Sequence, residues 1–204
     1  MRKFSLLVFL CLCLELHAED FKILQMNTSS IKIGTAQCKP GDVFSDEDEI
    51  FWTNEKQAMK AMNVKTRETR LFVAKEFSRA RATNVKDFFL KENHLSSRGG
   101  ATSFSDLAEE LQETVYLYDI VSINSPVELD SLSCYVISYG EGAKKWRTLM
   151  STDKTFYLSR ELFSEVSDEA ELTLTLYFRR KNQPKDYLIT SDLHVVLLPL
   201  QLDE

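Results

Sequence analysis

Residues 171–178 alternate between two kinds of side chain. Leucine or phenylalanine occupies positions 172, 174, 176 and 178, and threonine or tyrosine occupies positions 173, 175 and 177. Because successive side chains of a strand point to opposite faces of the sheet, this period of two predicts a half-buried β-strand. A chain with this segment is expected to build a sheet that buries one face.

The C-terminal part of the chain contains several more segments of this kind. Candidate strands lie at 115–123, 133–139, 146–150, 155–158, 187–190 and 193–200. About seven strands in roughly ninety residues predict a β-sandwich of immunoglobulin-like architecture over residues 114–204. Cys134 precedes Trp146 as the first cysteine precedes the core tryptophan in such domains, although the second cysteine is missing.

The N-terminal part shows shorter strand patterns separated by turn residues. Candidate strands lie at 21–26, 30–38, 50–52 and 71–73, and residues 57–64 fit either a strand or a helix. Short strands at this density predict a small barrel-like β domain over residues 19–77. A helical or loop linker is expected over residues 78–113, where Ser103 and Asp106 have capping-box spacing ahead of Leu107 and Leu111. The expected fold class is therefore mainly β.

The first eighteen residues have the pattern of a secretory signal peptide. Arg2 and Lys3 precede an apolar run over residues 4–14, and the small residue Ala18 follows. The run is too short for a stable bilayer span, which needs about 20 residues. We therefore expect cleavage after Ala18, with residues 1–18 removed. Two alternatives remain open, namely a buried N-terminal helix and a lipoprotein signal acylated at Cys11 or Cys13.

Charge and hydropathy restrict the partners. The net charge of −6 becomes −7 when Arg2, Lys3 and Glu15 leave with the leader. So acidic a chain is a poor candidate for nucleic-acid binding, which needs a positive surface. No later segment is apolar enough to be an integral membrane segment. The expected partner is a protein or a glycan of the cell envelope.

Cysteine and histidine residues offer one catalytic hypothesis. Cys134 and His194 could form a hydrolytic dyad if the sandwich brought their strands together. His194 alternates with apolar neighbours, so a histidine on a sheet face is the favoured interpretation, and His94 lies in a polar loop. Cys38 and Cys134 are either a disulfide or two separate thiols. The sequence contains no nucleophile elbow, zinc-protease motif or phosphate loop, and we expect no cofactor.

The acidic run at residues 46–49 is a candidate metal site. Asp46 and Asp48 could bind Ca²⁺, but the run lacks the glycine and the ligand spacing of a calcium loop. A solvated acidic loop is the favoured interpretation. Aromatic residues are a further candidate, either as an exposed binding patch or as core. They are Phe51, Trp52, Tyr135, Tyr139 and Trp146.

Three short segments resemble small exported proteins of Bacteroidetes that have no assigned function. The segments are Ile50-Phe51-Trp52, residues 56–60 (KQAMK) and residues 95–99 (LSSRG). The resemblance covers roughly residues 20–100 and implies export in a bacterium with two membranes. It implies no catalytic residue.

Two modification patterns are also present. Asp130-Ser131-Leu132 matches the short pattern that some Bacteroidetes use for O-glycosylation, which makes Ser131 a candidate acceptor. Asn27-Thr28-Ser29 matches the N-glycosylation sequon.

The sequence thus favours an exported, non-enzymatic binding or interaction module of the periplasm or cell surface. The alternatives are an accessory subunit of an envelope complex and a cysteine-dependent hydrolase of unfamiliar type. An exposed strand edge that recruits a partner by strand addition would suit the first hypothesis.

Overall fold

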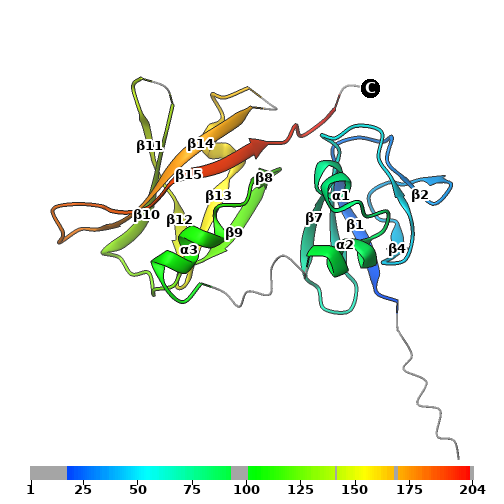
Figure 1. Ribbon diagram of the computed structural model, residues 1–204, viewed down its shortest axis with the longest axis horizontal. Coiled ribbons are helices and arrows are strands. Elements are labelled where there is room, and N and C mark those ends of the chain that lie inside the picture. Colours follow the sequence, from blue (N-terminus) through cyan, green and yellow to red (C-terminus); the bar gives the residue numbers. More distant parts are fainter. Residues whose placement is uncertain (1–17, 93–100, 141, 168–169, 203–204) are drawn as a thin grey trace, which may run out of the picture.

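The computed structural model describes residues 18–92, 101–140, 142–167 and 170–202. They form two β-rich halves that lie side by side (Figure 1). We call residues 18–92 the N-terminal half and residues 101–202 the C-terminal half. Residues 1–17 lie outside the described residues, so the leader and its cleavage after Ala18 stay predictions.

The N-terminal half is built on an antiparallel sheet with the strand order β4-β1-β6-β7. Its strands are β1 (Asp20–Met26), β4 (Val43–Ser45), β6 (Ala58–Asn63) and β7 (Thr69–Val73). A second sheet, in the order β3-β2-β5, contains β2 (Lys32–Ile33), β3 (Ala36–Gln37) and β5 (Ile50–Phe51). The barrel-like domain expected here therefore takes the form of two open sheets.

Two helices complete the core of this half. They are α1 (Ala74–Ala80), which directly follows β7, and α2 (Val85–Glu92). The Phe77 ring of α1 stacks on the Phe88 ring of α2, with 4.5 Å between the ring centres. Both rings belong to the buried cluster that also contains Phe21 of β1 and Phe72 of β7. The segment expected as a linker, residues 78–113, thus contributes helix α2 to the N-terminal core.

The C-terminal half has a five-stranded and a three-stranded sheet. The order β11-β10-β14-β15-β8 joins β8 (Val115–Leu117), β10 (Ser133–Tyr139), β11 (Lys145–Thr148), β14 (Glu171–Arg180) and β15 (Tyr187–Leu197). The order β12-β13-β9 joins β9 (Ile120–Asn124), β12 (Met150–Thr152) and β13 (Thr155–Ser159). All neighbours are antiparallel except β8, which runs parallel to β15. The mainly β, sandwich-like fold predicted for this half is confirmed.

The core of this sandwich lies between its two sheets. Leu174 and Leu176 of β14 are fully buried in it, as the alternation at residues 171–178 predicts. Tyr135 of β10 stacks on Phe156 of β13 with 4.0 Å between ring centres, and its hydroxyl is 2.9 Å from the Ser125 hydroxyl. The stacked pair joins the two sheets and satisfies a buried phenol at the same time.

Two short helical segments attach to the sandwich. Helix α3 (Phe104–Glu110) begins with the predicted capping box, in which the Asp106 N–H donates to the Ser103 hydroxyl. Leu107 and Leu111 are buried in the sandwich core, as expected. The 3-10 helix η1 (Arg160–Phe163) follows β13 and buries Phe163.

Trp146 does not occupy the place of a core tryptophan. It lies on the edge strand β11 with 47% of its surface exposed, and it packs on Tyr177 of β14, on the outer face of the same sheet. Tyr135 fills the core instead, because it alternates onto the inner face of β10. The Cys134–Trp146 comparison is therefore wrong in detail, and the immunoglobulin-like assignment stays a prediction.

Candidate functional site

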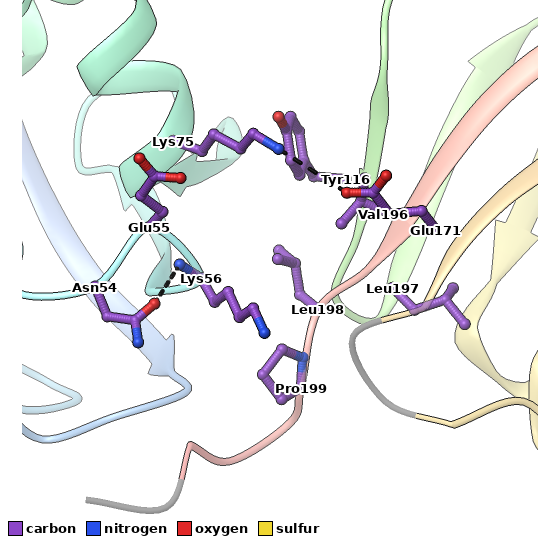
Figure 2. A pocket seen from close by; sticks show the side chains of 10 residues that line it. All are labelled: Asn54, Glu55, Lys56, Lys75, Tyr116, Glu171, Val196, Leu197, Leu198 and Pro199. Carbon is purple, nitrogen blue, oxygen red and sulfur yellow. Dashed lines mark hydrogen bonds and ion pairs between the residues drawn. The ribbon is translucent and has the colours of Figure 1, made fainter.

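A cleft runs along the seam between the two halves. Its smaller chamber, of about 320 Å³, is drawn in Figure 2. Its larger chamber, of about 690 Å³, extends from there over helix α1 and the outer face of β14 and β15. The two chambers share five lining residues, which are Glu55, Lys75, Tyr116, Glu171 and Val196. Both halves therefore contribute to one continuous site.

The floor of the cleft is apolar. Tyr116 of β8 lies opposite Val196 of β15 in the parallel register, so both side chains are on the same face of the sheet. They pack against a buried cluster formed by Ala58, Val73, Tyr118 and Leu198. Because Ala58 and Val73 come from the N-terminal half and the other two from the C-terminal half, this cluster is the apolar part of the seam.

The walls of the cleft hold charges of both signs. Lys75 of α1 points across the cleft to Glu171 of β14, with 4.0 Å between ammonium and carboxylate (Figure 2). The two side chains are 50% and 75% exposed, so the pair adds little stability and can exchange for a ligand's charges. Arg79, one helical turn after Lys75, adds a second cation. The walls can thus meet a ligand that has both positive and negative groups.

Tyr116 contributes a hydroxyl group to the cleft, between its apolar floor and its charged walls. Burial raises its pKa, and the carboxylates of Glu76 and Glu171 add to the rise, while Arg79 opposes it. The hydroxyl makes no hydrogen bond with any residue that the structure describes. A neutral phenol at the edge of an apolar floor is a donor available to a ligand.

Asn27 joins the two halves by hydrogen bonds at the seam, next to the cleft. Its side chain is 1% exposed, and its amide nitrogen donates to the carbonyls of Lys56 at 2.9 Å and Pro199 at 3.3 Å. Its amide oxygen accepts the Ala58 N–H, and its backbone carbonyl accepts the Leu202 N–H at 2.6 Å. The turn after β1 thereby holds the chain that leaves β15. Glycosylation of the Asn27 sequon is incompatible with this fold because the amide is buried and bonded.

The structure does not bring Cys134 and His194 together. Cys134 of β10 lies opposite Arg179 of β14, whereas His194 of β15 lies opposite Thr173 of the same strand. The two positions on β14 are separated by roughly 20 Å at the rise of a β-strand. A nucleophile and its base must come within hydrogen-bond reach, so the dyad hypothesis is wrong. His94 lies outside the described residues.

The two remaining cysteines are free thiols in different halves of the protein. Cys38 is buried in the N-terminal cluster, where its thiol donates to the Ile31 carbonyl at 3.2 Å. Burial raises its pKa to about 11. Cys134 is half-buried on β10. The disulfide hypothesis is therefore wrong, and the seam is held by Asn27 and the apolar cluster instead.

The acidic run at residues 46–49 stabilises the turn in which it lies. Asp46 accepts the Glu19 N–H, and Asp48 accepts the Ser45 N–H at 2.8 Å, which shapes the turn after β4. Among the residues that the structure describes, no group of three or more potential ligands is placed to hold a metal ion. Asp46 and Asp48 are therefore turn residues here rather than an assembled calcium site.

The other candidates divide between surface and core. Ser131 is exposed in the turn before β10, so a modifying enzyme can reach it. Tyr135 and Tyr139 are buried, Trp52 packs on Phe77, and Phe51 and Trp146 are exposed on different halves. The five aromatic residues therefore do not form one binding patch.

Comparison with known proteins gives no further guide. No protein-family model, no curated protein and no solved structure matches this chain. None of the described helices is long and apolar enough to cross a membrane. The site rests on geometry alone, and the sequence missed it because Lys75, Tyr116 and Glu171 belong to no motif and meet only in three dimensions.

Proposed function

We propose that this protein is an exported, non-enzymatic interaction module of the bacterial cell envelope whose cleft binds a segment of a partner protein. The observation that carries the proposal is the composite cleft, with an apolar floor and walls of both charge signs. The leader pattern at residues 1–18 supports export. The separation of Cys134 from His194 argues against the hydrolase alternative that uses this pair.

A protein segment suits the cleft better than a glycan. Lys75, Arg79 and Glu171 can pair with acidic and basic side chains, and the Tyr116–Val196 floor offers apolar contact to a nonpolar side chain. Glycans are usually held on exposed aromatic faces, whereas Tyr116 is half-buried. The same contacts would also suit this protein as an accessory subunit that binds its partner within a larger envelope complex.

Affinity purification from the native envelope tests this proposal. We expect the tagged protein to begin at Glu19 and to recover a defined partner, and we expect Lys75→Glu to lose that partner. The matched control is Lys65→Glu, which makes the same charge change on an exposed turn outside the cleft. Recovery of the protein alone, recovery of a glycan, or an uncleaved cytoplasmic chain would each contradict the proposal.

A further inference from the structure

Strand β9 lies at the edge of the three-stranded sheet of the sandwich. Its one strand partner among the described residues is β13, in a continuous register from Ile120 opposite Ser159 to Asn124 opposite Thr155. The edge therefore runs for five residues without a bulge, which is about 17 Å at the strand rise.

The hydrogen bonds at the two ends of β9 fix which backbone groups face outward. The Arg160 N–H donates to the Asp119 carbonyl, and the Ser125 N–H donates to the Lys154 carbonyl. Both bonds continue the β9–β13 register, so the odd-numbered residues of β9 bond to β13. In an antiparallel ladder the alternate residues then point their N–H and C=O groups away. The outward groups belong to Ile120, Ser122 and Asn124, and no described residue pairs with them.

This edge has none of the usual protections. Natural edge strands are blunted by lysine, proline, bulges or short length. The opposite sheet's edge strand β11 has Lys145 and Arg147 in four residues, and β8 and β12 have three residues each. By contrast, β9 has the uncharged sequence Ile-Val-Ser-Ile-Asn. It is a template for another strand.

The core beneath β9 is also incompletely covered. Val121 and Ile123 point inward and pack against the buried cluster, but both are only half-buried. An added strand would place its own inward side chains beside these two and extend the core. Backbone pairing and apolar burial thus favour the same occupant.

We propose that β9 accepts an extended segment of a partner protein by strand addition. Its occupant is about five residues long and apolar at every second position, with basic flanking residues that complement the net charge of −6. A second copy of this chain fits less well. An edge of this length buries far less than the roughly 1,200 Å² of a stable dimer, and two chains of net charge −6 repel. The edge is a different surface from the cleft, so this inference goes beyond the proposed function.

A synthetic peptide tests the edge directly. The probe has the β13 sequence Thr-Phe-Tyr-Leu-Ser between two lysines at each end, because β13 already pairs with β9. A scrambled peptide of the same composition is the control for charge. Backbone amide exchange in the protein is the readout. We expect the peptide to slow exchange at Ile120, Ser122 and Asn124, whose amides face outward, and to leave Val121 and Ile123 unchanged.

Two variants at one position separate backbone pairing from side-chain contact. Ser122→Pro removes the outward N–H, which an edge strand tolerates, and should weaken peptide binding by roughly tenfold or more. Ser122→Ala keeps the N–H and should bind as the wild type does. If Ser122→Pro does not fold, Ser122→Lys serves, because a lysine at the edge opposes strand addition.

Three results would overturn this proposal. The first is equal binding of the designed and scrambled peptides, the second is protection confined to cleft residues, and the third is equal binding by Ser122→Pro and wild type. If the wild type sediments as a dimer and Ser122→Pro as a monomer, the occupant of the edge is a second copy of this chain, and the proposed partner protein is ruled out. Because the assay needs neither export nor an intact cleft, its outcome is independent of the envelope purification.

Discussion

The side-chain amide of Asn27 donates a hydrogen bond to the carbonyl of Pro199, which is 172 positions away in the chain. This contact joins the turn after β1 to the segment that leaves β15. It shows that the seam beside the cleft is a packed and hydrogen-bonded region. The cleft can therefore present charges from both halves in a fixed arrangement.

Replacing Asn27 should weaken the whole protein. Asn27→Ala leaves the buried Ala58 N–H without an acceptor and removes two donated bonds, which costs about 2–3 kcal/mol of unfolding free energy. Urea unfolding measures the change. Asn54→Ala is the control, since the Asn54 side chain accepts only an exposed Lys56 N–H, and should cost well under half as much. Equal effects of the two variants would contradict the role given to Asn27.

Glu165 should make stability depend on pH in the acid range. Its carboxylate accepts hydrogen bonds from the Tyr139 hydroxyl, Lys145 and Arg147, and the Tyr139 bond contributes most to lowering its pKa to about 2. A depressed folded-state pKa gives a contribution that is present above the ordinary value of 4.5 and is lost as pH falls through about 2.

Glu165→Gln tests this dependence by unfolding at several pH values. The variant should be less stable than the wild type at pH 7, and the difference should shrink between pH 4.5 and 2. Glu128→Gln is the control, because that carboxylate is 82% exposed and 3.6 Å from Lys154. A difference that is constant with pH would count against the Glu165 cluster.

Thiol chemistry should distinguish the two free cysteines. Cys38 is buried and its pKa is raised to about 11, so a thiol reagent should modify it far more slowly than the half-buried Cys134. Mass spectrometry of the protein purified without reductant should show both thiols labelled after unfolding. Loss of two mass units through an internal disulfide would contradict the separation of the two thiols.

A core substitution tests the alternation on which the fold prediction began. Leu174 is fully buried on β14, whereas Thr173 beside it faces outward. Leu174→Ala should lower the unfolding free energy by about 2–5 kcal/mol, and Thr173→Ala should change it by less than about 1 kcal/mol. Thermal or urea unfolding of the pair provides the comparison.

Local patterns predicted part of this fold well. The alternation at residues 171–178 and the Ser103–Asp106 capping box both depend on residues close in sequence, and both are confirmed. The expected strand at residues 30–38 is instead two short strands joined at Gly34, whose φ of +59° favours glycine. In the sequence, Ile31 and Ile33 alternate with Lys32 and Gly34 as they would in one continuous strand, so the turn at Gly34 is not visible in the pattern.

The candidate site was beyond the reach of such patterns. The sequence singles out Asn27 only as a glycosylation sequon, and the burial of its side chain depends on Pro199 and Leu202 from the far end of the chain. Tyr116 reaches the cleft because β8 pairs in parallel with β15, and no local spacing specifies a parallel partner. Non-local pairing, rather than composition, creates the site.

Site-specific photo-crosslinking in living cells tests the central claim most directly. A photoreactive phenylalanine at position 116, in the cleft floor, should form an adduct with one envelope protein. The same probe at position 177, on the outer face beside Trp146, is the control and should not form that adduct. An identical adduct from both positions, or none from position 116 in correctly folded protein, would contradict a partner-binding cleft.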